Sequence, residues 1–248
     1  MIKKLKRSLL YGYRIIFPDT PTAVMIRCLT YIDSTNKKWL SRGSEKGLSV
    51  GHYFEFGVWN GVSLERFWEC TKWMFGSRED NNWQIYGFDS FEGLPEPKGT
   101  PDLHEFVGKG SFKSTGITDI SNLLKKSGCE SARLKLVSGY FDESLTEDLK
   151  NDLGFPKASI VNIDVDYYSS TIDVLNWIED LLYDGSLIYF DDINFYNRNP
   201  SKGQVKAINE FNGLRKNAGL AAMPGLDRFE RVYVYWRNDD QSNENLKF

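Results

Sequence analysis

The sequence has few cysteines, and they lie far apart. Cys28, Cys70 and Cys129 are odd in number and form no CxxC pair, which argues against both a disulfide framework and a cysteine-rich zinc site. We therefore expect a reducing environment and predict a cytoplasmic protein. Long apolar runs are also absent. A transmembrane helix needs about 20 consecutive apolar residues, and the 248 residues contain no such run.

An excess of positive charge is missing as well. The formal net charge is -3, and no basic stripe runs through the middle of the chain, so nothing would neutralise a phosphate backbone. We expect no nucleic-acid partner. Hydrophobic residues make up 41% and charged residues 26% of the sequence, which is typical of globular proteins. The length suits one well-buried domain with an elaboration rather than two full-sized domains.

The start of the chain is basic and then briefly apolar, with tyrosines and Arg14 mixed into the apolar part. It resembles the beginning of a signal peptide, but no convincing cleavage site of small residues follows. We predict an amphipathic helix that covers the functional site or an oligomer interface; an anchor on a membrane surface is the alternative. We interpret residues 1–50 as a helical extension or lid, 51–237 as the main domain and 238–248 as a polar tail.

From Gly51 onward, short apolar runs alternate with longer helical patterns, which is typical of βαβ units and a parallel sheet. Strands are expected at residues 52–57, 83–88, 134–137, 159–163 and 185–190. Helices are expected at residues 63–75, 118–126, 142–153, 169–182 and 202–216, with Asp142 as the N-cap of the third. The alternating pattern at 231–236 predicts a last strand at the far edge of the sheet. The fold class is therefore α/β, with helices on both faces of the sheet.

The first predicted strand runs into Glu55-Phe56-Gly57-Val58-Trp59-Asn60-Gly61, which places two glycines where a strand turns into a helix. Glycines at such a turn let a ligand approach the backbone and meet free N–H groups. The spacing differs from the GxGxxG of dinucleotide-binding proteins, and Glu55 would repel a pyrophosphate. The same carboxylate would attract the ammonium of an amino-acid head group, which favours S-adenosylmethionine over NAD.

Asp89 ends the second predicted strand. In such folds an acidic residue at this position accepts hydrogen bonds from ribose hydroxyls, so it supports a nucleoside site. Purely structural interpretations also exist. Glu55 could pair with a lysine, Gly57 and Gly61 could form a tight turn without a ligand, and Asp89 could cap a turn or a helix.

Three more aspartates follow neighbouring predicted strands: Asp164, Asp191 and Asp192. Parallel strands bring their carboxyl ends to one edge, so these side chains are expected to converge beside the nucleoside site. Carboxylates that close repel one another unless a cation is present, and oxygen ligands suit Mg²⁺ or Ca²⁺. Such a metal could lower the pKa of a substrate hydroxyl and hold it in line with a methyl group while a carboxylate takes the proton.

Other acidic and basic side chains are assigned structural roles. Asp166 could share the metal site, but we favour it as the N-cap of the helix that begins near Ser169. The alternative for Asp191 and Asp192 is an ordinary polar loop. His52 and His104 are expected to be structural or exposed rather than catalytic.

Between Tyr53 and Phe211 the sequence resembles the macrocin O-methyltransferase (TylF-like) family of class I S-adenosylmethionine-dependent methyltransferases. The residues that carry the resemblance are EFGVWNG at 55–61, FDSFEGLP at 88–95, GYFDESL at 139–145, IDVDYYSST at 163–171 and the pair Asp191-Asp192. The resemblance implies a Rossmann-like, mostly parallel sheet of seven strands with a last antiparallel edge strand. It also implies methylation of a hydroxyl on a sugar, nucleotide sugar or glycoside.

The resemblance further implies roles for individual residues. Asp164, Asp191 and Asp192 would bind Mg²⁺, or another hard divalent cation such as Ca²⁺ or Mn²⁺, and Asp164 would also be the general base. The implied cofactor-binding residues are Glu55, Gly57, Val58, Asn60, Gly61, Ser63, Asp89, Ser90, Gly139, Tyr140, Phe141 and Asp164. A homodimer or larger assembly is implied as well.

The chain departs from the family pattern in its first 50 residues and at 194–200, which is longer and more aromatic than usual. Both regions shape the acceptor pocket in the family, so the acceptor stays open. A methyltransferase of the same fold that acts on a catechol-like phenol is one alternative. A non-catalytic S-adenosylmethionine-binding partner in a glycan pathway is another. A dehydrogenase is disfavoured by the glycine spacing.

Overall fold

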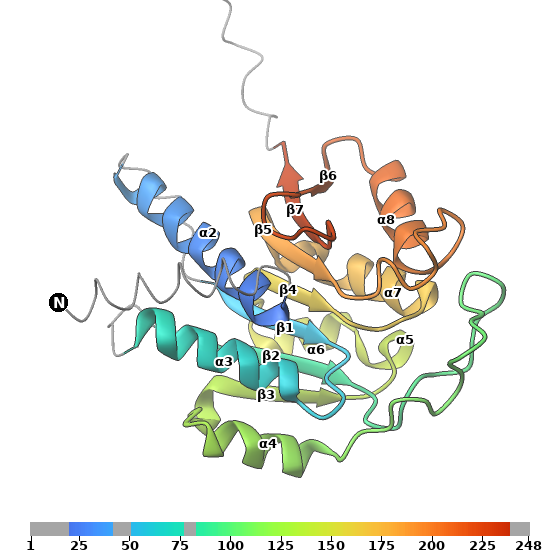
Figure 1. Ribbon diagram of the computed structural model, residues 1–248, viewed down its shortest axis with the longest axis horizontal. Helices are drawn as coiled ribbons and strands as arrows, with labels where there is room; N and C mark the ends of the chain where they lie inside the picture. The colour runs from blue at the N-terminus through green and yellow to red at the C-terminus, as the bar shows by residue number, and fades with distance from the viewer. Residues whose placement is uncertain (1–19, 42–50, 77–82, 239–248) are drawn as a thin grey trace, which may run out of the picture.

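The computed structural model describes residues 20–41, 51–76 and 83–238, with the side chains of 36–41 left out (Figure 1). These residues form a seven-stranded sheet in the order β3-β2-β1-β4-β5-β7-β6. The strands are β1 (His52–Phe56), β2 (Ile85–Asp89), β3 (Leu134–Ser138), β4 (Ala158–Ile163), β5 (Leu182–Phe190), β6 (Ala218–Ala222) and β7 (Val232–Arg237). Strands β1 to β5 pair in parallel, and β7 runs antiparallel to both β5 and β6. The predicted fold class is confirmed.

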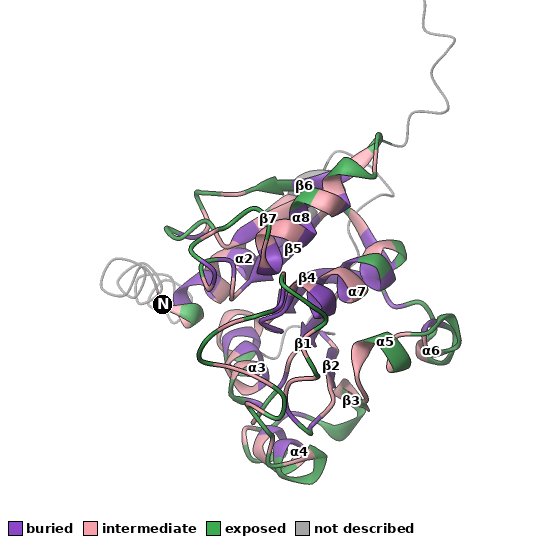
Figure 2. Ribbon diagram, turned by 90° about the vertical axis from the view of Figure 1, so that its right-hand side faces the viewer, coloured by how far each residue is buried: buried purple, intermediate pink, exposed green. Residues whose placement is uncertain are grey.

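Helices cover both faces of this sheet (Figure 1). The helices are α2 (Pro21–Ser41), α3 (Val62–Phe75), α4 (Ile117–Lys126), α5 (Phe141–Ser144), α6 (Glu147–Leu153), α7 (Tyr168–Ile178) and α8 (Gly203–Gly213), with 3-10 turns η1 (Ser131–Arg133) and η2 (Glu179–Leu181). Alternate residues of a strand point to opposite faces. Tyr53 therefore packs with α2, α3 and α4, whereas Phe54 and Phe56 pack with α7 and α8. Figure 2 shows the buried residues gathered along the strands and the helix faces turned toward them.

The last strand is antiparallel, as predicted, but its predicted place at the edge is corrected. β7 lies between β5 and β6, so β6 is the edge strand on that side. The sequence of β6, AGLAA, contains no β-branched or aromatic residue, and such strands leave no recognisable pattern.

Helix α8 begins and ends close to the predicted limits.

The helix predicted over 142–153 is two helices. Thr146 begins the second one: its Oγ1 accepts a hydrogen bond from the Leu149 N–H at 3.1 Å, which is a side-chain cap. Asp142 is not a cap but lies inside α5, and its carboxylate is paired with Lys98 at 2.8 Å. The helix predicted over 169–182 ends earlier, at Ile178, because η2 follows and β5 already begins at Leu182.

Helix α2 supplies the helical part of the predicted N-terminal extension, and its Val24, Cys28 and Leu29 are buried against the sheet. The amphipathic start of the chain and nearly all of the polar tail fall on 1–19 and 239–248, outside the described residues. Within the described ranges no helix is long and apolar enough to cross a membrane. All three cysteines are free and buried. This agrees with the expectation from the sequence that they form no disulfide framework.

The loop at 90–116 is the longest connection near the carboxyl ends of the strands. Its base is closed by two backbone hydrogen bonds, from Leu94 N to Ser111 O and from Gly110 N to Leu94 O. Asp102 is fully buried, and its carboxylate accepts hydrogen bonds from the N–H groups of Ser169 and Lys98 at 2.9 and 2.8 Å. The loop is thereby attached to the first turn of α7.

Candidate active site

A cavity of about 350 Å³ opens at the carboxyl ends of the parallel strands. Each of the five strands contributes at least one residue to its wall, in the order that the sheet imposes: Tyr140 after β3, Asp89 at the end of β2, Gly57 after β1, Asp164 after β4 and Asp191 after β5. Neighbouring strands lie about 4.8 Å apart, so the wall extends about 19 Å across four strand spacings. This is the predicted convergence of strand ends.

The predicted cofactor-binding residues divide into two groups. Those that line the cavity are Gly57, Asp89, Ser90, Gly139, Tyr140, Phe141 and Asp164. Those that are not part of its wall are Glu55, Val58, Asn60, Gly61 and Ser63. Ser63 instead lines a second cavity of about 90 Å³ beneath α2, which shares Asp164 and Asp191 with the main cavity. Asn60 holds the long loop, because its Oδ1 accepts a hydrogen bond from Thr115 N at 3.0 Å.

The two glycines after β1 serve the packing of the chain itself. Gly57 has φ +85°, and a Cβ on it would lie 1.7 Å from the carbonyl oxygen of Asp164. Gly61 has φ +77°, and a Cβ on it would lie 2.7 Å from Cγ2 of Ile120. Both positions therefore require glycine. Gly57 brings the end of β1 against the end of β4, which places Asp164 beside the turn.

Glu55 is enclosed rather than presented to the cavity. It is fully buried, and its two carboxylate oxygens accept hydrogen bonds from Tyr53 OH and Ser63 Oγ, each at 2.5 Å. Burial raises the pKa of Glu55 to about 7. Glu55 follows Tyr53 by two residues, so both side chains point to the face that α3 covers. The structure thus shows Glu55 joining β1 to α3, with no lysine among the described partners of its carboxylate.

Asp89 lines the cavity and also fixes the turn after β1. Its Oδ2 accepts hydrogen bonds from the N–H groups of Val58 and Trp59 at 2.7 and 2.8 Å, and its Oδ1 accepts one from Phe91 N at 2.7 Å. An ionised carboxylate offers about four lone-pair sites. Three are used by the backbone, which leaves room for one further hydrogen bond from a ligand.

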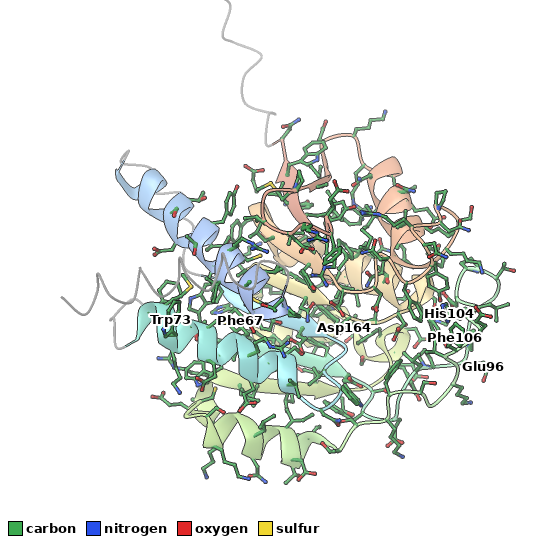
Figure 3. All side chains as sticks on the ribbon, in the orientation of Figure 1. Phe67, Trp73, Glu96, His104, Phe106 and Asp164 are labelled. Atoms are coloured by element: carbon green, nitrogen blue, oxygen red, sulfur yellow. The ribbon has the colours of Figure 1, made fainter. Side chains whose placement is uncertain are left out.

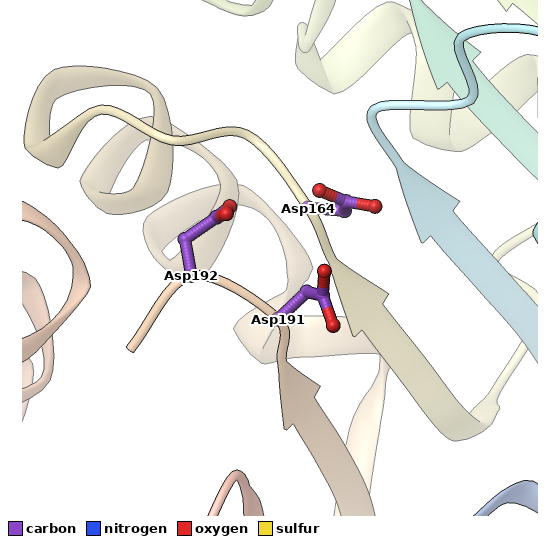
Figure 4. Close-up of side chains that lie close together, drawn as sticks. All are labelled: Asp164, Asp191 and Asp192. Carbon is purple, nitrogen blue, oxygen red and sulfur yellow. The ribbon is translucent and has the colours of Figure 1, made fainter. Parts of the chain in front are cut away.

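Asp164, Asp191 and Asp192 come together as predicted, at the ends of two neighbouring strands (Figure 4). One carboxylate oxygen from each lies within 4.8 Å of the others. Asp191 accepts a hydrogen bond from Tyr189 OH at 2.8 Å and lies 3.5 Å from the Arg231 guanidinium. For the Asp164 carboxylate, the described part of the chain supplies no hydrogen-bond donor.

The negative charges of the carboxylates in this cluster repel one another. Burial, and then the carboxylates of Asp192 and Asp191, raise the pKa of Asp164 well above its ordinary value. The pKa of Asp192 is likewise raised well above its ordinary value, by burial first and by Asp166 next. Buried carboxylates repel one another in this way when no cation lies between them. The donor set, three carboxylates with oxygen ligands only, is the kind that hard divalent cations bind.

A protein-family model described as macrocin-O-methyltransferase (TylF) matches residues 45–238. The chain belongs to this family. It is therefore an O-methyltransferase, which excludes the dehydrogenase and the non-catalytic binding protein as interpretations of the site. No curated protein sequence matches the chain.

Solved methyltransferase structures share the fold. The chain matches the calicheamicin methyltransferase CalS11 with a TM-score of 0.61 and 24% identity, over 86% of this chain and 79% of that one. An apo structure of CalS11, described as a TDP-rhamnose 3'-O-methyltransferase, matches with a TM-score of 0.53, 23% identity and the same coverage. The O-methyltransferase NovP matches with a TM-score of 0.52 and 18% identity, again over 86% and 79%.

In this O-methyltransferase Asp166 does not have the predicted role of N-cap. Its backbone is left-handed, with φ +56°, and its N–H donates to Asp192 Oδ2 at 2.9 Å. The N–H of Ser169 is instead bonded by Asp102, from the long loop. Asp166 lines the cavity, and burial together with the charge of Asp191 raises its pKa to about 6.

Several cavity residues escaped sequence reasoning because loop folding brings them there. Lys98 and Phe112 come from the long loop, and Ser169 and Asp173 from α7. Lys98 Nζ lies 2.8 Å from Asp142 and 3.9 Å from Asp173, so it bridges the loop to the other wall. The one available signal was the family-like segment at 163–171, which contains Ser169.

Proposed function

We propose that this O-methyltransferase transfers the methyl group of S-adenosylmethionine to a hydroxyl of a sugar, carried by a nucleotide or a glycoside, in the cytoplasm. A divalent cation such as Mg²⁺ would be held by Asp164, Asp191 and Asp192. The observation that carries the proposal is the cluster of these three carboxylates inside a cavity lined by the ends of five parallel strands. One structural neighbour, CalS11, is described as a methyltransferase of TDP-rhamnose, which supports a sugar as the acceptor class.

The residues present fit a hard divalent cation. Three carboxylates offer oxygen ligands within reach of one another, and among the described residues the ion pair of Asp191 with Arg231 is the one contact of the cluster with a cationic side chain. The negative charge in excess of that pair is what a divalent cation would balance. When bound, the cation would polarise the acceptor hydroxyl and lower its pKa.

The other end of the cavity fits the nucleoside of the cofactor. The volume of about 350 Å³ lies in the range of small-molecule sites. Asp89 retains capacity for a hydrogen bond from a ribose hydroxyl, and Ser90 lies next to it. Aromatic surface for a purine would come from Tyr140, Phe141 and Trp59, which line the same cavity.

Between these two ends, Asp164 would act as the general base. Its carboxylate has no donor within the described chain, so its lone pairs are free for the acceptor's proton as well as for a cation. Gly57 sets its position, since the backbone of the turn and the Asp164 carbonyl meet without a side chain between them. The long loop, attached through Asp102, would limit access of water to this part of the cavity.

The decisive experiment uses the full chain after its metal has been stripped with a chelator. We expect S-adenosylmethionine to bind in calorimetry and labelled methyl groups to pass to sugars of an acceptor panel only after Mg²⁺ is added, with at least a hundredfold difference in rate. Mg²⁺ at about a hundred times its Kd should also stabilise the stripped protein by about 2.7 kcal/mol, seen as a higher melting temperature. Transfer that is insensitive to the chelator, or no cofactor binding, would contradict the proposal.

Two further expectations accompany this proposal. We propose a homodimer or larger assembly. The molar mass from light scattering during size-exclusion chromatography will test it. We also propose that residues 1–50 serve as a lid, because α2 forms one wall of the second cavity beside Asp164 and Asp191.

A further inference from the structure

An aromatic surface adjoins the aspartates at the β5 end of the cavity. Phe195 lines the cavity and stacks on His104, with ring centroids 3.9 Å apart and planes inclined by 15°. The Phe195 N–H donates to the carbonyl of Asp192 at 2.8 Å. The ring is therefore held at a fixed position relative to the carboxylate cluster. We call the stacked pair of His104 and Phe195 the aromatic platform.

The platform is supported from behind. Tyr196 packs edge-on against both rings, with centroids 5.2 Å from each. Tyr196 is itself buried, and its hydroxyl donates to the carbonyl of Asp102 at 2.9 Å. Asp102 is the buried residue that attaches the long loop to α7. A surface preformed in this way loses little conformational freedom when a ligand binds.

Exposed apolar side chains lie beside the platform and on the cavity wall. Phe106, whose side chain lies near His104, is 79% exposed, and the neighbouring Leu103 is 53% exposed. Figure 3 shows His104 and Phe106 on the side of Asp164 where the long loop lies. Toward the β1 end, Trp59 and Phe112 also line the cavity, half exposed and in edge contact. Clustered exposed apolar residues around a cavity indicate a binding surface.

One buried polar atom that has no partner in the described part of the chain, Ser169 Oγ, lies on the cavity wall beside two carboxylates. Ser169 lines the cavity, is 7% exposed, and its buried Oγ has no hydrogen-bond partner among the described residues. Asp166 and Asp173 also line the cavity, and Asp173 lies 3.9 Å from Lys98 Nζ. A buried polar atom needs a partner, and carboxylates need donors. A ligand with hydroxyls along its edge would supply hydrogen bonds to this wall.

We infer that Phe195 receives the C–H face of the acceptor's sugar ring, with His104 behind it in the aromatic platform, while Ser169 Oγ bonds one of the ring's hydroxyls. A pyranose combines an apolar face with an edge of hydroxyls, whereas a catechol presents a flat face but too few hydroxyl groups for this wall. The platform then determines which hydroxyl of the ring reaches Asp164. This inference rests on the proposed function. The ring itself comes from either a glycoside or a nucleotide sugar, and the experiment separates the two.

The test measures binding by saturation-transfer NMR, with the full chain, S-adenosylhomocysteine and Mg²⁺ present. The probes are methyl glycosides of neutral hexoses and 6-deoxyhexoses, the uridine-diphosphate forms of the same sugars, and catechol. We expect saturation on sugar-ring protons. Phe195→Ala and His104→Ala should each weaken sugar binding about 3- to 10-fold, and His104→Phe, which keeps the stack, should restore it. Affinity for the cofactor should change less than twofold.

The matched control is Phe155→Ala, which removes an exposed aromatic side chain at the opposite end of β4 and should leave sugar binding unchanged. Saturation on the uridine ring, with Phe195→Ala weakening only the nucleotide sugars, would show that the platform binds a base and would overturn the inference. Catechol binding more tightly than every sugar, or no sugar binding at millimolar concentration, would overturn it too. Failure of the proposed function shows differently, as loss of cofactor binding or of metal dependence.

Discussion

The carboxylates near the ends of β1 and β2 differ in their hydrogen-bond partners from those near the ends of β4 and β5. On the β1 and β2 side, Glu55 accepts hydrogen bonds from two hydroxyls, and Asp89 accepts three from backbone N–H groups. On the β4 and β5 side, Asp164 has no donor within the described chain. The carboxylates of Asp191 and Asp192, at the end of β5, instead lie close to that of Asp164. The carboxylates of the first group have donors within the chain, whereas that of Asp164 has none among the described residues.

This difference distinguishes carboxylates that hold the fold together from those for which we propose a role in binding and catalysis. Two unit charges within 4.8 Å of each other repel by at least about 3 kcal/mol at an effective dielectric constant near 20, so the cluster costs stability unless a cation binds. The carboxylates with internal donors have the opposite effect, because removing them leaves buried donors unsatisfied. Substitutions on the two sides should therefore move activity and stability in different directions.

The largest expected effect is that of Asp164→Asn. The variant loses a proposed cation ligand and the proposed base, so kcat should fall at least about a thousandfold. Cofactor affinity should stay nearly unchanged, because the cofactor contacts that we propose lie mainly at the other end of the cavity. In the metal-free protein the melting temperature should rise, since one repelling charge is gone. Steady-state kinetics, calorimetry and thermal unfolding measure the three quantities.

Asp148→Asn on the exposed surface of α6 is the control for Asp164→Asn and should change none of these quantities. An Asp164→Asn enzyme that remains active would show that the base is assigned to the wrong residue. A lower melting temperature without metal would show that Asp164 supports the fold, which would remove the contrast between the two sides.

A smaller effect, of opposite sign on stability, is expected for Asp89→Ala. Three backbone N–H groups lose their acceptor, which should lower the free energy of unfolding by about 3 kcal/mol. Cofactor affinity should fall as well, because the turn after β1 loses its anchor. Asp89→Asn, which keeps an acceptor oxygen, should recover part of the stability. Urea unfolding measures the first effect, and an unchanged midpoint in Asp89→Ala would contradict it.

Sequence reasoning succeeded where topology alone decides the geometry. Asp164 and Asp191 meet because their strands are parallel neighbours, and the strand positions follow from apolar runs such as that of β4, which is buried throughout. It failed for β6, whose alanines and glycine carry no strand pattern. It also failed at the break between α5 and α6, where one capping side chain, Thr146, decides the outcome.

The parts of the site that escaped sequence reasoning depend on contacts between distant loops. The stack of His104 on Phe195, and the bond from Ser169 to Asp102, join residues that no local pattern relates. The burial of Glu55 under α3 could have been predicted from the sequence. Tyr53 and Glu55 are two residues apart in β1, so both side chains point to the face that α3 covers. Strand parity, applied to each strand-end residue, distinguishes those that face a helix from those that face the cavity.

The effect of Glu55→Gln is confined to stability and depends on pH, and it vanishes near pH 4.5. Burial raises the pKa of Glu55 from 4.5 to about 7 in the folded protein, so the stability gained by keeping this group neutral is complete below pH 4.5 and is lost as the pH rises through 7. Glutamine cannot ionise. The metal-free variant should therefore equal the wild type near pH 4.5 and exceed its free energy of unfolding by about 3 kcal/mol at pH 8. Urea unfolding across this range, with the exposed Glu143→Gln as control, measures the difference. A difference that does not vary with pH would show that hydrogen bonding to Tyr53 and Ser63, rather than charge, governs this carboxyl.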